Sequence, residues 1–349
     1  MAGWLEGDQR MKIAVVFDTV FAGLEHADFQ EELEAQVPEA EYEVAEALME
    51  NGHEVHLIGF HDNLRRLLDR LEEFEPDFVF NATESYMGKA RYDYAVTALL
   101  EMKGYRYSGS PPEALLLARD KATSKKILSW HSVSVPRFAV YAPGDKVEPS
   151  REMGFPIIVK PIHEDASVGI SQSSVVNDVD SLRERVEFIH RNLNQSAIAE
   201  GMIDGRELYV GILGNHRLQV LPVVEITFDK IQESGKKIAT YNAKWDLEYR
   251  ERWGIKNIFA RRIGKQAMEE IVRVSKLAYT ALGLRDYGRI DLRLTPDQRV
   301  FVLEVNPNPY IAFGEDMANS AERVGLDYNQ FIERIVREAL SRYEKAKET

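Results

Sequence analysis

The chain has 349 residues, enough for two or three domains with a substantial core, and its 44% hydrophobic and 29% charged residues exclude a disordered or collagen-like chain. The absence of cysteine excludes disulfides, thiolate nucleophiles and cysteine-containing zinc sites, and it fits a reducing cytosol. A net charge of -13 argues against a protein that binds nucleic acid by neutralising phosphates.

The N-terminal region shows no export or membrane signal. Residues 1–10 contain no basic stretch followed by an apolar run, and no part of the chain approaches the ~20 apolar residues that span a bilayer. We therefore expect a soluble, cytoplasmic protein with no membrane partner. Residues 1–10 precede the first strand pattern and are treated as an extension outside the fold.

Acidic residues are concentrated between residues 13 and 64. This stretch holds 13 acidic residues and no Lys or Arg. A solvated acidic surface is the favoured interpretation. The alternative is an electrostatic potential that attracts a cationic substrate.

The first third of the chain predicts an α/β domain. Apolar runs of strand length cover residues 12–18, 53–60 and 77–84, and a helix over 39–51 ends at an Asn-Gly stop signal. A further helix is predicted over residues 90–103. Pro111 and Pro112 then interrupt the chain, and we place the first domain boundary there.

The remaining elements alternate between helices and strands. The runs from residue 196 to 228 predict an antiparallel meander with turns at Asp204-Gly205 and Gly214-Asn215. Residues 227–264 contain an irregular, charged run that is predicted to be either a lid over phosphates or an ordinary surface loop. The other predicted helices are 120–130, 178–193, 265–282 and 328–347, and the other predicted strands are 155–160, 287–295 and 299–307.

Five polar residues near the C-terminal end predict a metal site. Because side chains alternate along a strand, Arg289, Asp291 and Arg293 share one face, as do Glu304 and Asn306 on the next strand. Only a short connection over residues 296–299 separates the two strands, so they are expected to pair. Asp291, Glu304 and Asn306 would then offer three oxygen donors, which suit Mg²⁺. A surface ladder of salt bridges is the alternative.

Lys160 marks a second candidate site. It ends an apolar strand and precedes a loop with Ser167 and Gly169, which together could offer an ammonium and backbone N–H groups to phosphate oxygens. The segment lacks the GxxxxGK[ST] pattern of a Walker A loop. A lysine extending to solvent at a strand end is the alternative.

Taken in order, six segments resemble the ATP-grasp superfamily and, within it, the D-alanine–D-alanine ligase branch. They are SGSPPEALLLARDK (108–121), FPIIVKP followed by SVG (155–169), AEGMIDGRE (199–207), YNAKW (241–245), GRIDLR (288–293) and LEVNPNP (303–309). The resemblance implies an α/β and α+β architecture, in which a Rossmann-like pre-ATP-grasp domain (11–110) precedes a central (111–195) and a C-terminal (196–349) ATP-grasp subdomain. It also implies a homodimer.

The same resemblance implies roles for individual residues. Lys121, Lys160 and Lys244 would hold the phosphates of ATP, together with the loop that contains Ser167. Glu200 and Ile203 would lie at the adenine and Glu207 at the ribose. Asp291, Glu304 and Asn306 would bind two Mg²⁺ ions, and Arg289 would stabilise the transferred phosphoryl group. Arg289, Lys244 and Lys160 are therefore the expected catalytic residues.

The implied reaction joins a small carboxylate to an amine, such as amino acids or small peptides. A carboxylate resists attack by an amine, so ATP first converts it to an acyl phosphate, which the amine then attacks. Lysines, an arginine and metal ions would stabilise the charge that spreads over the phosphoryl group. No covalent protein nucleophile is required.

Departures from the D-alanine–D-alanine ligase pattern fall at the amino-acid pocket. Ala166 replaces a serine, Trp245 replaces a tyrosine, Tyr310 replaces a glycine, and the usual N-terminal Gly-Gly-x-Ser-x-Glu segment is missing. Trp245, Arg289 and Tyr310 are the expected substrate contacts. The sequence therefore predicts a ligase that does not make D-alanyl-D-alanine, and that accepts an apolar, aromatic or cationic substrate.

Two alternatives stay open. One is a true D-alanine–D-alanine ligase with a divergent pocket. The other is a non-catalytic ATP-binding regulatory protein, although simple nucleotide binding requires neither a phosphoryl-transfer arginine nor a complete metal face.

Overall fold

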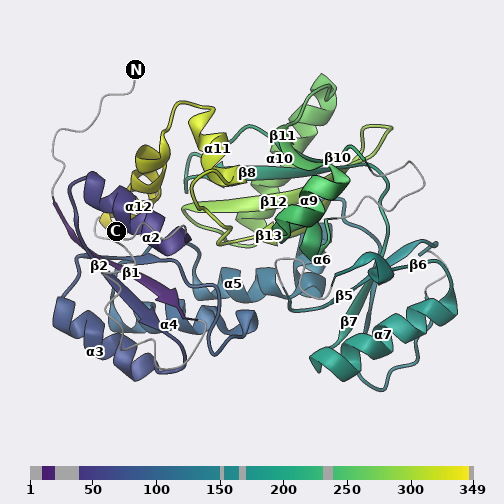
Figure 1. Cartoon of the computed structure of the whole chain (residues 1–349), viewed down its shortest axis with the longest axis horizontal. Helices are drawn as coiled ribbons and strands as arrows, with labels where there is room; N and C mark the ends of the chain where they lie inside the picture. The colour runs from purple at the N-terminus through teal and green to yellow at the C-terminus, as the bar shows by residue number, and fades with distance from the viewer. Residues whose placement is uncertain (1–9, 20–38, 150–152, 165–169, 231–238, 346–349) are drawn as a thin grey trace. The chain divides into compact units, whose positions relative to one another are not determined.

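The computed structural model describes residues 10–19, 39–149, 153–164, 170–230 and 239–345 (Figure 1). Contacts between Cα atoms divide the chain into two compact units. Unit 1 comprises residues 1–112, 214–216 and 310–349, and unit 2 comprises residues 113–213 and 217–309. The three-domain division expected from the sequence stays a prediction. In the part of the chain that the structure describes, no helix is long and apolar enough to cross a membrane.

Unit 1 is built around a parallel three-stranded sheet. In spatial order its strands are β2 (Glu54–Phe60), β1 (Lys12–Asp18) and β3 (Phe78–Asn81). Helices of this unit are α2 (Ala40–Glu50), α3 (Leu64–Phe74), α4 (Tyr94–Lys103), α11 (Asp316–Glu322) and α12 (Tyr328–Lys345), with the short 3-10 helix η2 (Ala90–Tyr92) before α4. The predicted α/β start of the chain is confirmed.

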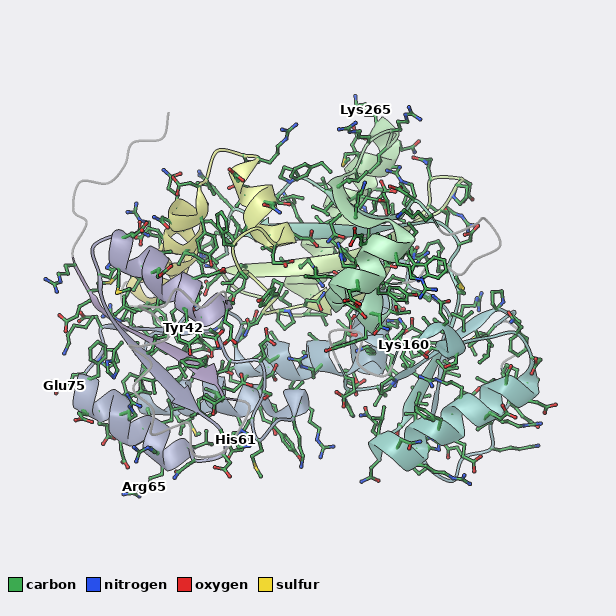
Figure 2. The ribbon with its side chains drawn as sticks, viewed as in Figure 1. Tyr42, His61, Arg65, Glu75, Lys160 and Lys265 are labelled. Atoms are coloured by element: carbon green, nitrogen blue, oxygen red, sulfur yellow. The ribbon has the colours of Figure 1, made fainter. Side chains whose placement is uncertain are left out.

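Apolar side chains of the strands form the core of unit 1. Val16 and Ile58 are fully buried on neighbouring strands, as expected for parallel strands covered by helices. Tyr42 of α2, labelled in Figure 2, is buried. Its ring lies edge-on against Phe17 of β1. The closing helix α12 is tied to this core by the Tyr343 hydroxyl, which accepts from the backbone N–H of Tyr107.

Unit 2 contains two antiparallel sheets. The smaller has the order β4 (Phe138–Tyr141), β7 (Ala197–Gly201), β5 (Ile157–Pro161), β6 (Val175–Val176). The larger has the order β11 (Ile255–Phe259), β10 (Val224–Phe228), β8 (Arg206–Leu213), β12 (Tyr287–Leu294), β13 (Val300–Asn306), with β9 (Gln219–Val220) paired to β8. Its helices are α5 (Pro112–Arg119), whose first residue belongs to unit 1, α6 (Lys121–Trp130), α7 (Val179–Leu193), α8 (Tyr241–Trp245), α9 (Leu247–Trp253), α10 (Lys265–Ala281) and the 3-10 helix η3 (Gln172–Ser174).

The helices cover the sheets with apolar faces. Leu182, Val186 and Ile189 of α7 are buried against the smaller sheet, at the i, i+4, i+7 spacing of one helix face. Asp178 caps α7, and its carboxylate accepts from the backbone N–H of Ser181 in a capping box. α10 contributes its buried apolar residues, including Ile271, to the core of the larger sheet.

Two predictions about connections are wrong. The runs after residue 196 do not form one meander, because β7 pairs with β4 and β5 while β8 pairs with β10 and β12. Asp204-Gly205 therefore passes the chain from one sheet to the other instead of closing a hairpin, whereas Gly214-Asn215 does connect paired strands, β8 and β9. The described part of residues 227–264 is also more regular than predicted, since it contains α8, α9 and β11.

Candidate active site

The polar face predicted near the C-terminal end is formed by paired strands. β12 pairs with β13 so that Asp291 lies opposite Glu304 and Arg289 opposite Asn306. A register shift follows Asp291, which is the irregularity expected of a β-bulge. The predicted pairing of these strands is confirmed. It places two carboxylates and one amide on adjacent positions of the sheet.

Asp291 is held by cationic side chains. Its carboxylate accepts from Arg289 Nε at 2.7 Å and Nη2 at 3.0 Å, and Lys244 Nζ of α8 lies 4.0 Å away. Burial raises the pKa of Asp291, although Arg289 and Lys244 oppose the rise. The Tyr209 ring lies beneath both cations, with its centroid 5.0 Å from Arg289 Cζ and 5.7 Å from Lys244 Nζ. The buried carboxylate of Asp291 therefore lies between two cationic side chains.

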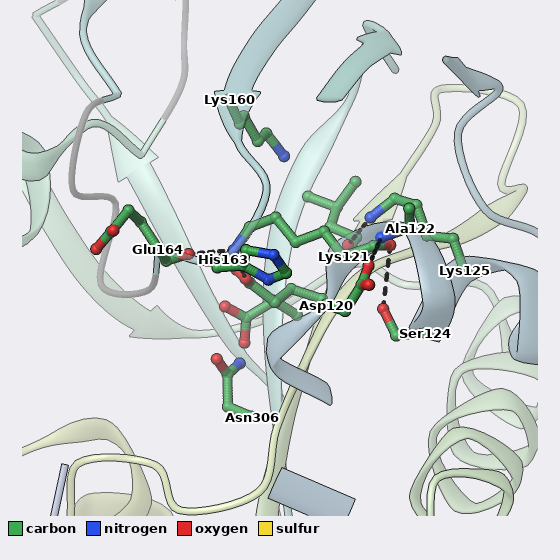
Figure 3. A network of polar contacts seen from close by, with 12 residues as sticks. Asp120, Lys121, Ala122, Ser124, Lys125, Lys160, His163, Glu164 and Asn306 are labelled. Carbon is green, nitrogen blue, oxygen red and sulfur yellow. Dashed lines mark hydrogen bonds and ion pairs between the residues drawn. The ribbon is translucent and has the colours of Figure 1, made fainter. Parts of the chain in front are cut away.

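Lys121 begins α6, which is shown with its neighbours in Figure 3. Asp120 caps this helix by accepting from the backbone N–H groups of Ala122 and Thr123, both at 2.9 Å. The cap fixes where the helix starts, and hence where Lys121 lies. Lys121 Nζ pairs with Glu304 Oε1 at 2.7 Å and also donates to the carbonyl oxygen of Glu164. The second proposed metal carboxylate thus also has a lysine partner.

Two lysines converge on one buried carboxylate. Glu200 Oε2 lies 3.0 Å from Lys160 Nζ, and Glu200 Oε1 lies 3.0 Å from Lys125 Nζ. Burial alone would raise the pKa of Glu200, but the two lysines outweigh it and hold that pKa at about 2. Burial lowers the pKa of Lys125 in spite of Glu200, whereas Glu200 overcomes burial and raises the pKa of Lys160. The two ammonium groups and the one carboxylate carry a net positive charge, which favours the binding of an anion.

Lys125 was not predicted as a site residue. Its Nζ also donates to the carbonyl oxygen of Leu303 in β13 at 2.5 Å, so it links α6 to both sheets. A signal existed in the sequence, since residues i and i+4 lie on one face of a helix. Lys121 and Lys125 are therefore neighbours one turn apart.

A second buried ion pair joins β8 to β12. Arg293 lies opposite Glu207, and Arg293 Nη2 donates to Glu207 Oε2 at 2.7 Å. The other carboxylate oxygen, Oε1, accepts from the Tyr209 hydroxyl at 3.2 Å. Arg293 and Tyr209 were not predicted as site residues, although Arg293 shares the polar face of β12 that the alternation predicted.

One pocket in unit 2 collects most of the candidate residues. Its lining includes Lys160, Glu200, Ile203, Glu207, Lys244, Asp291, Arg293 and Glu304. Lys121, Arg289 and Asn306 are not part of the lining. Lys121 pairs with Glu304 and Arg289 with Asp291, both of which line the pocket, whereas Asn306 donates to the carbonyl oxygen of Arg289. The loop with Ala166, Ser167 and Gly169, and the side chain of Trp245, lie outside the described residues.

Tyr310 belongs to unit 1, where it has acidic neighbours. Burial raises the pKa of its hydroxyl to about 12, and Glu315, Glu43 and Glu84 add to the rise. Its backbone φ is not positive, so a tyrosine is accommodated at this position without backbone strain. Burial also raises the pKa of the nearby Glu41 to about 7. Residues 20–38, which hold much of the acidic stretch, lie outside the described residues.

The donor set on β12 and β13 fits a magnesium ion that completes its shell with substrate oxygens. Within residues 10–19, 39–149, 153–164, 170–230 and 239–345, no three His, Asp or Glu side chains are grouped as a metal site. Asp291 and Glu304 are only two carboxylates, with Asn306 as an amide beside them. Mg²⁺ is commonly bound by one or two carboxylates together with waters and substrate phosphates.

Comparison with known proteins identifies the family of this chain. The family model for the C-terminal domain of D-alanine–D-alanine ligases matches residues 133–337. An uncharacterised protein of Sinorhizobium fredii, y4sG, is 32% identical over 95% of this chain and 98% of its own length. A D-alanine–D-alanine ligase of Aquifex aeolicus is 30% identical over 84% of this chain and 92% of its own length.

A solved structure shares the fold. The crystal structure of D-alanine–D-alanine ligase from Bacillus anthracis complexed with ATP superposes with a TM-score of 0.74 at 21% identity, covering 96% of this chain and 99% of that one. The expected combination of an α/β domain with an ATP-grasp fold is thereby confirmed. From the family model and the relatives, this chain belongs to the D-alanine–D-alanine ligase family of ATP-grasp enzymes, which form a C–N bond and release ADP and phosphate.

Proposed function

We propose that this protein is an ATP- and Mg²⁺-dependent carboxylate–amine ligase that acts through an acyl phosphate and does not make D-alanyl-D-alanine. The observation that carries the proposal is the pocket of unit 2, whose lining holds both Lys160 beside Glu200 and the cross-strand carboxylates Asp291 and Glu304. A polyphosphate nucleotide needs both features, because its oxygens bind to ammonium groups and to a divalent cation.

The nucleotide is assigned to this pocket residue by residue. Lys121, Lys160 and Lys244 bind phosphate oxygens, and the loop with Ser167 adds backbone donors. The connection around Ile203, next to Glu200, holds the adenine, and Glu207 holds the ribose. Asp291, Glu304 and Asn306 hold Mg²⁺, which would neutralise phosphate charge when bound. Lys121 pairs with Glu304, and Lys244 and Arg289 pair with Asp291, so these cations lie beside the carboxylates that would hold Mg²⁺ and its phosphate ligands.

The reaction follows from these placements. An oxygen of the substrate carboxylate attacks the γ-phosphorus of ATP, and ADP leaves with the electron pair of the broken P–O bond. The amine nitrogen then attacks the acyl carbon, loses a proton, and expels inorganic phosphate. Arg289 is positioned beside Asp291 to stabilise charge on the transferred phosphoryl group. Since the chain has no cysteine, no thioester to a cysteine side chain takes part.

The substrate proposal rests on unit 1 and on the departures from the family pattern. Tyr310 stands where the family has a glycine, and it has Glu43, Glu84 and Glu315 as neighbours. These acidic groups support a cationic amine, such as a basic amino acid or a polyamine. Trp245 and Tyr310 support an apolar or aromatic group instead. A homodimer and a cytoplasmic location belong to the same proposal, and light scattering tests the first.

An ADP-release assay tests the function. The protein is incubated with Mg·ATP and a panel of D- and L-amino acids and polyamines, and the products are identified by mass spectrometry. We expect ADP formation that depends on a substrate other than D-alanine. D-alanyl-D-alanine as the main product would show a true D-alanine–D-alanine ligase, and ATP binding without turnover on any substrate would favour a regulatory protein.

A matched pair of variants ties the activity to the metal face. Asp291→Asn removes a buried carboxylate of β12, whereas Asp297→Asn changes a carboxylate in the turn after that strand whose side chain is 61% exposed. We expect the first variant to lose at least ~100-fold in kcat and the second to be unchanged, since removing one electrostatic contributor costs about that much. Equal activities would contradict the proposed metal site.

A further inference from the structure

Arg293 is a buried residue for which the proposed reaction has no role. Its side chain is 7% exposed and that of its partner Glu207 is 9% exposed, and both line the pocket of unit 2. A buried arginine is costly unless its donors are paired. Arg293 therefore needs an explanation beyond the salt-bridge ladder that the sequence alone suggested.

Arg293 fixes the carboxylate of Glu207 from one side. The two residues lie directly opposite each other on β12 and β8, and Arg293 Nη2 donates to Glu207 Oε2 at 2.7 Å. The Tyr209 hydroxyl holds the other oxygen, at 3.2 Å. A carboxylate accepts about four hydrogen bonds, so these two leave capacity for further donors. Both of its oxygens have a fixed position before any ligand arrives.

Arg293 also fixes the connection between β7 and β8. Its Nη1 donates to the carbonyl oxygen of Gly205 at 3.0 Å. Gly205 packs so tightly on β12 that a Cβ atom there would lie 2.2 Å from the carbonyl oxygen of Leu294. Met202 and Ile203 of the same connection line the pocket. One guanidinium thus holds both the segment proposed for the adenine and the carboxylate proposed for the ribose.

We propose that Arg293 is a positioning residue that makes the pocket select a ribonucleotide over a 2′-deoxyribonucleotide. The inference rests on the proposed function, because it takes Glu207 as the acceptor for the sugar hydroxyls. Arg293 holds that carboxylate where two neighbouring hydroxyls can donate to it, and its positive charge offsets the repulsion between Glu207 and the anionic nucleotide. The planar guanidinium of Arg293 presents several N–H donors in a fixed geometry, whereas a lysine in its place would offer only a point charge.

Arg206 provides a matched control. It precedes Glu207 on β8, and its Nε and Nη2 donate to the Glu225 carboxylate at 2.8 and 2.5 Å, but neither residue lines the pocket. Side chains alternate along the strand, so Arg206 and Glu207 lie on opposite faces of the sheet. Arg206→Met therefore breaks an arginine–glutamate pair on the same strand without touching the nucleotide face.

The test measures the dissociation constants of Mg·ATP and Mg·2′-deoxy-ATP by calorimetry, with thermal melting of each variant. A hydrogen bond to a charged group favours ATP by ~10- to 100-fold in the unmodified protein. We expect Arg293→Met to bring this ratio to within ~3-fold, Arg293→Lys to retain part of it, and Arg206→Met to leave it unchanged. Glu207→Gln should resemble Arg293→Met.

The outcomes separate the inference from the function on which it rests. If Arg293→Met and Arg293→Lys weaken both nucleotides equally and keep the ratio, Arg293 is merely structural and the inference is overturned. The same holds if the unmodified protein binds both nucleotides equally well. If it binds neither, the proposed function itself fails.

Discussion

Replacing Lys125 by methionine tests the buried charge cluster most directly. The substitution keeps the length of the side chain but removes the ammonium that joins Glu200 Oε1 to the carbonyl oxygen of Leu303. The charge-assisted hydrogen bond to Leu303 contributes about 1.5–3 kcal/mol. Removing one partner of a buried ion pair costs about 3–5 kcal/mol when the remaining charge is left alone.

The net cost is smaller than the sum of these two numbers. Glu200 keeps Lys160 at 3.0 Å, so its charge is still compensated. The ammonium of Lys125 also pays a desolvation cost, as its lowered pKa shows, and methionine avoids that cost. We therefore expect Lys125→Met to lower the free energy of unfolding by about 2–4 kcal/mol, and to weaken Mg·ATP binding because the cluster loses its net positive charge.

Urea-induced unfolding, monitored by tryptophan fluorescence, measures the change in the free energy of unfolding. Calorimetry with Mg·ATP measures the change in nucleotide affinity. Lys126→Met is the matched control, since Lys126 is the next residue of α6 and is exposed. The reasoning is refuted if the two variants unfold at the same urea concentration and bind Mg·ATP equally well.

Two further changes probe other parts of the molecule. Burial raises the pKa of Glu41 from 4.5 to about 7, so the folded protein holds a proton that the unfolded chain releases, and stability falls as the pH rises from about 4.5 to about 7. Glu41→Gln should remove this loss, so its gain in free energy of unfolding over the unmodified protein should be larger at pH 8 than at pH 4 by at most about 3 kcal/mol. Urea unfolding across pH measures this gain. Glu46→Gln, on the same helix, should show no such gain. Gly205→Ala should destabilise the protein by at least about 2 kcal/mol more than Gly144→Ala in thermal melting, because both glycines have positive φ but only Gly205 would bring a Cβ against backbone, at Leu294. A Gly205→Ala variant as stable as Gly144→Ala would show that the connection yields easily.

Apolar periodicity and helix caps predicted most of the helices and strands. Strands with alternating or continuous apolar residues, such as 12–18 and 287–294, and helices with clear caps, such as those at Asp120 and Asp178, lie where the sequence predicts them. The passage of the chain from the smaller to the larger sheet after β7 was not predicted, because an Asp-Gly step indicates a hairpin turn whichever sheet the next strand joins. Local sequence does not contain that information.

The site was predictable where spacing fixes it. The pairing of Asp291 with Glu304 followed from strand alternation and a short turn. The ion pair of Glu200 with Lys125 did not follow from spacing, because Lys125 lies on a helix 75 residues earlier in the chain. A buried lysine is recognised from sequence only with difficulty, since most lysines are exposed.

The position of β12 inside its sheet has a consequence for how activity is lost. β12 is hydrogen-bonded to β8 on one side and to β13 on the other, so it has no open edge. Its amide protons should exchange with solvent only when neighbouring strands separate, which makes this strand one of the last to open. Fraying at the ends of the chain would then leave Arg289, Asp291 and Glu304 in place, and these groups should keep their cross-strand arrangement until the larger sheet itself comes apart.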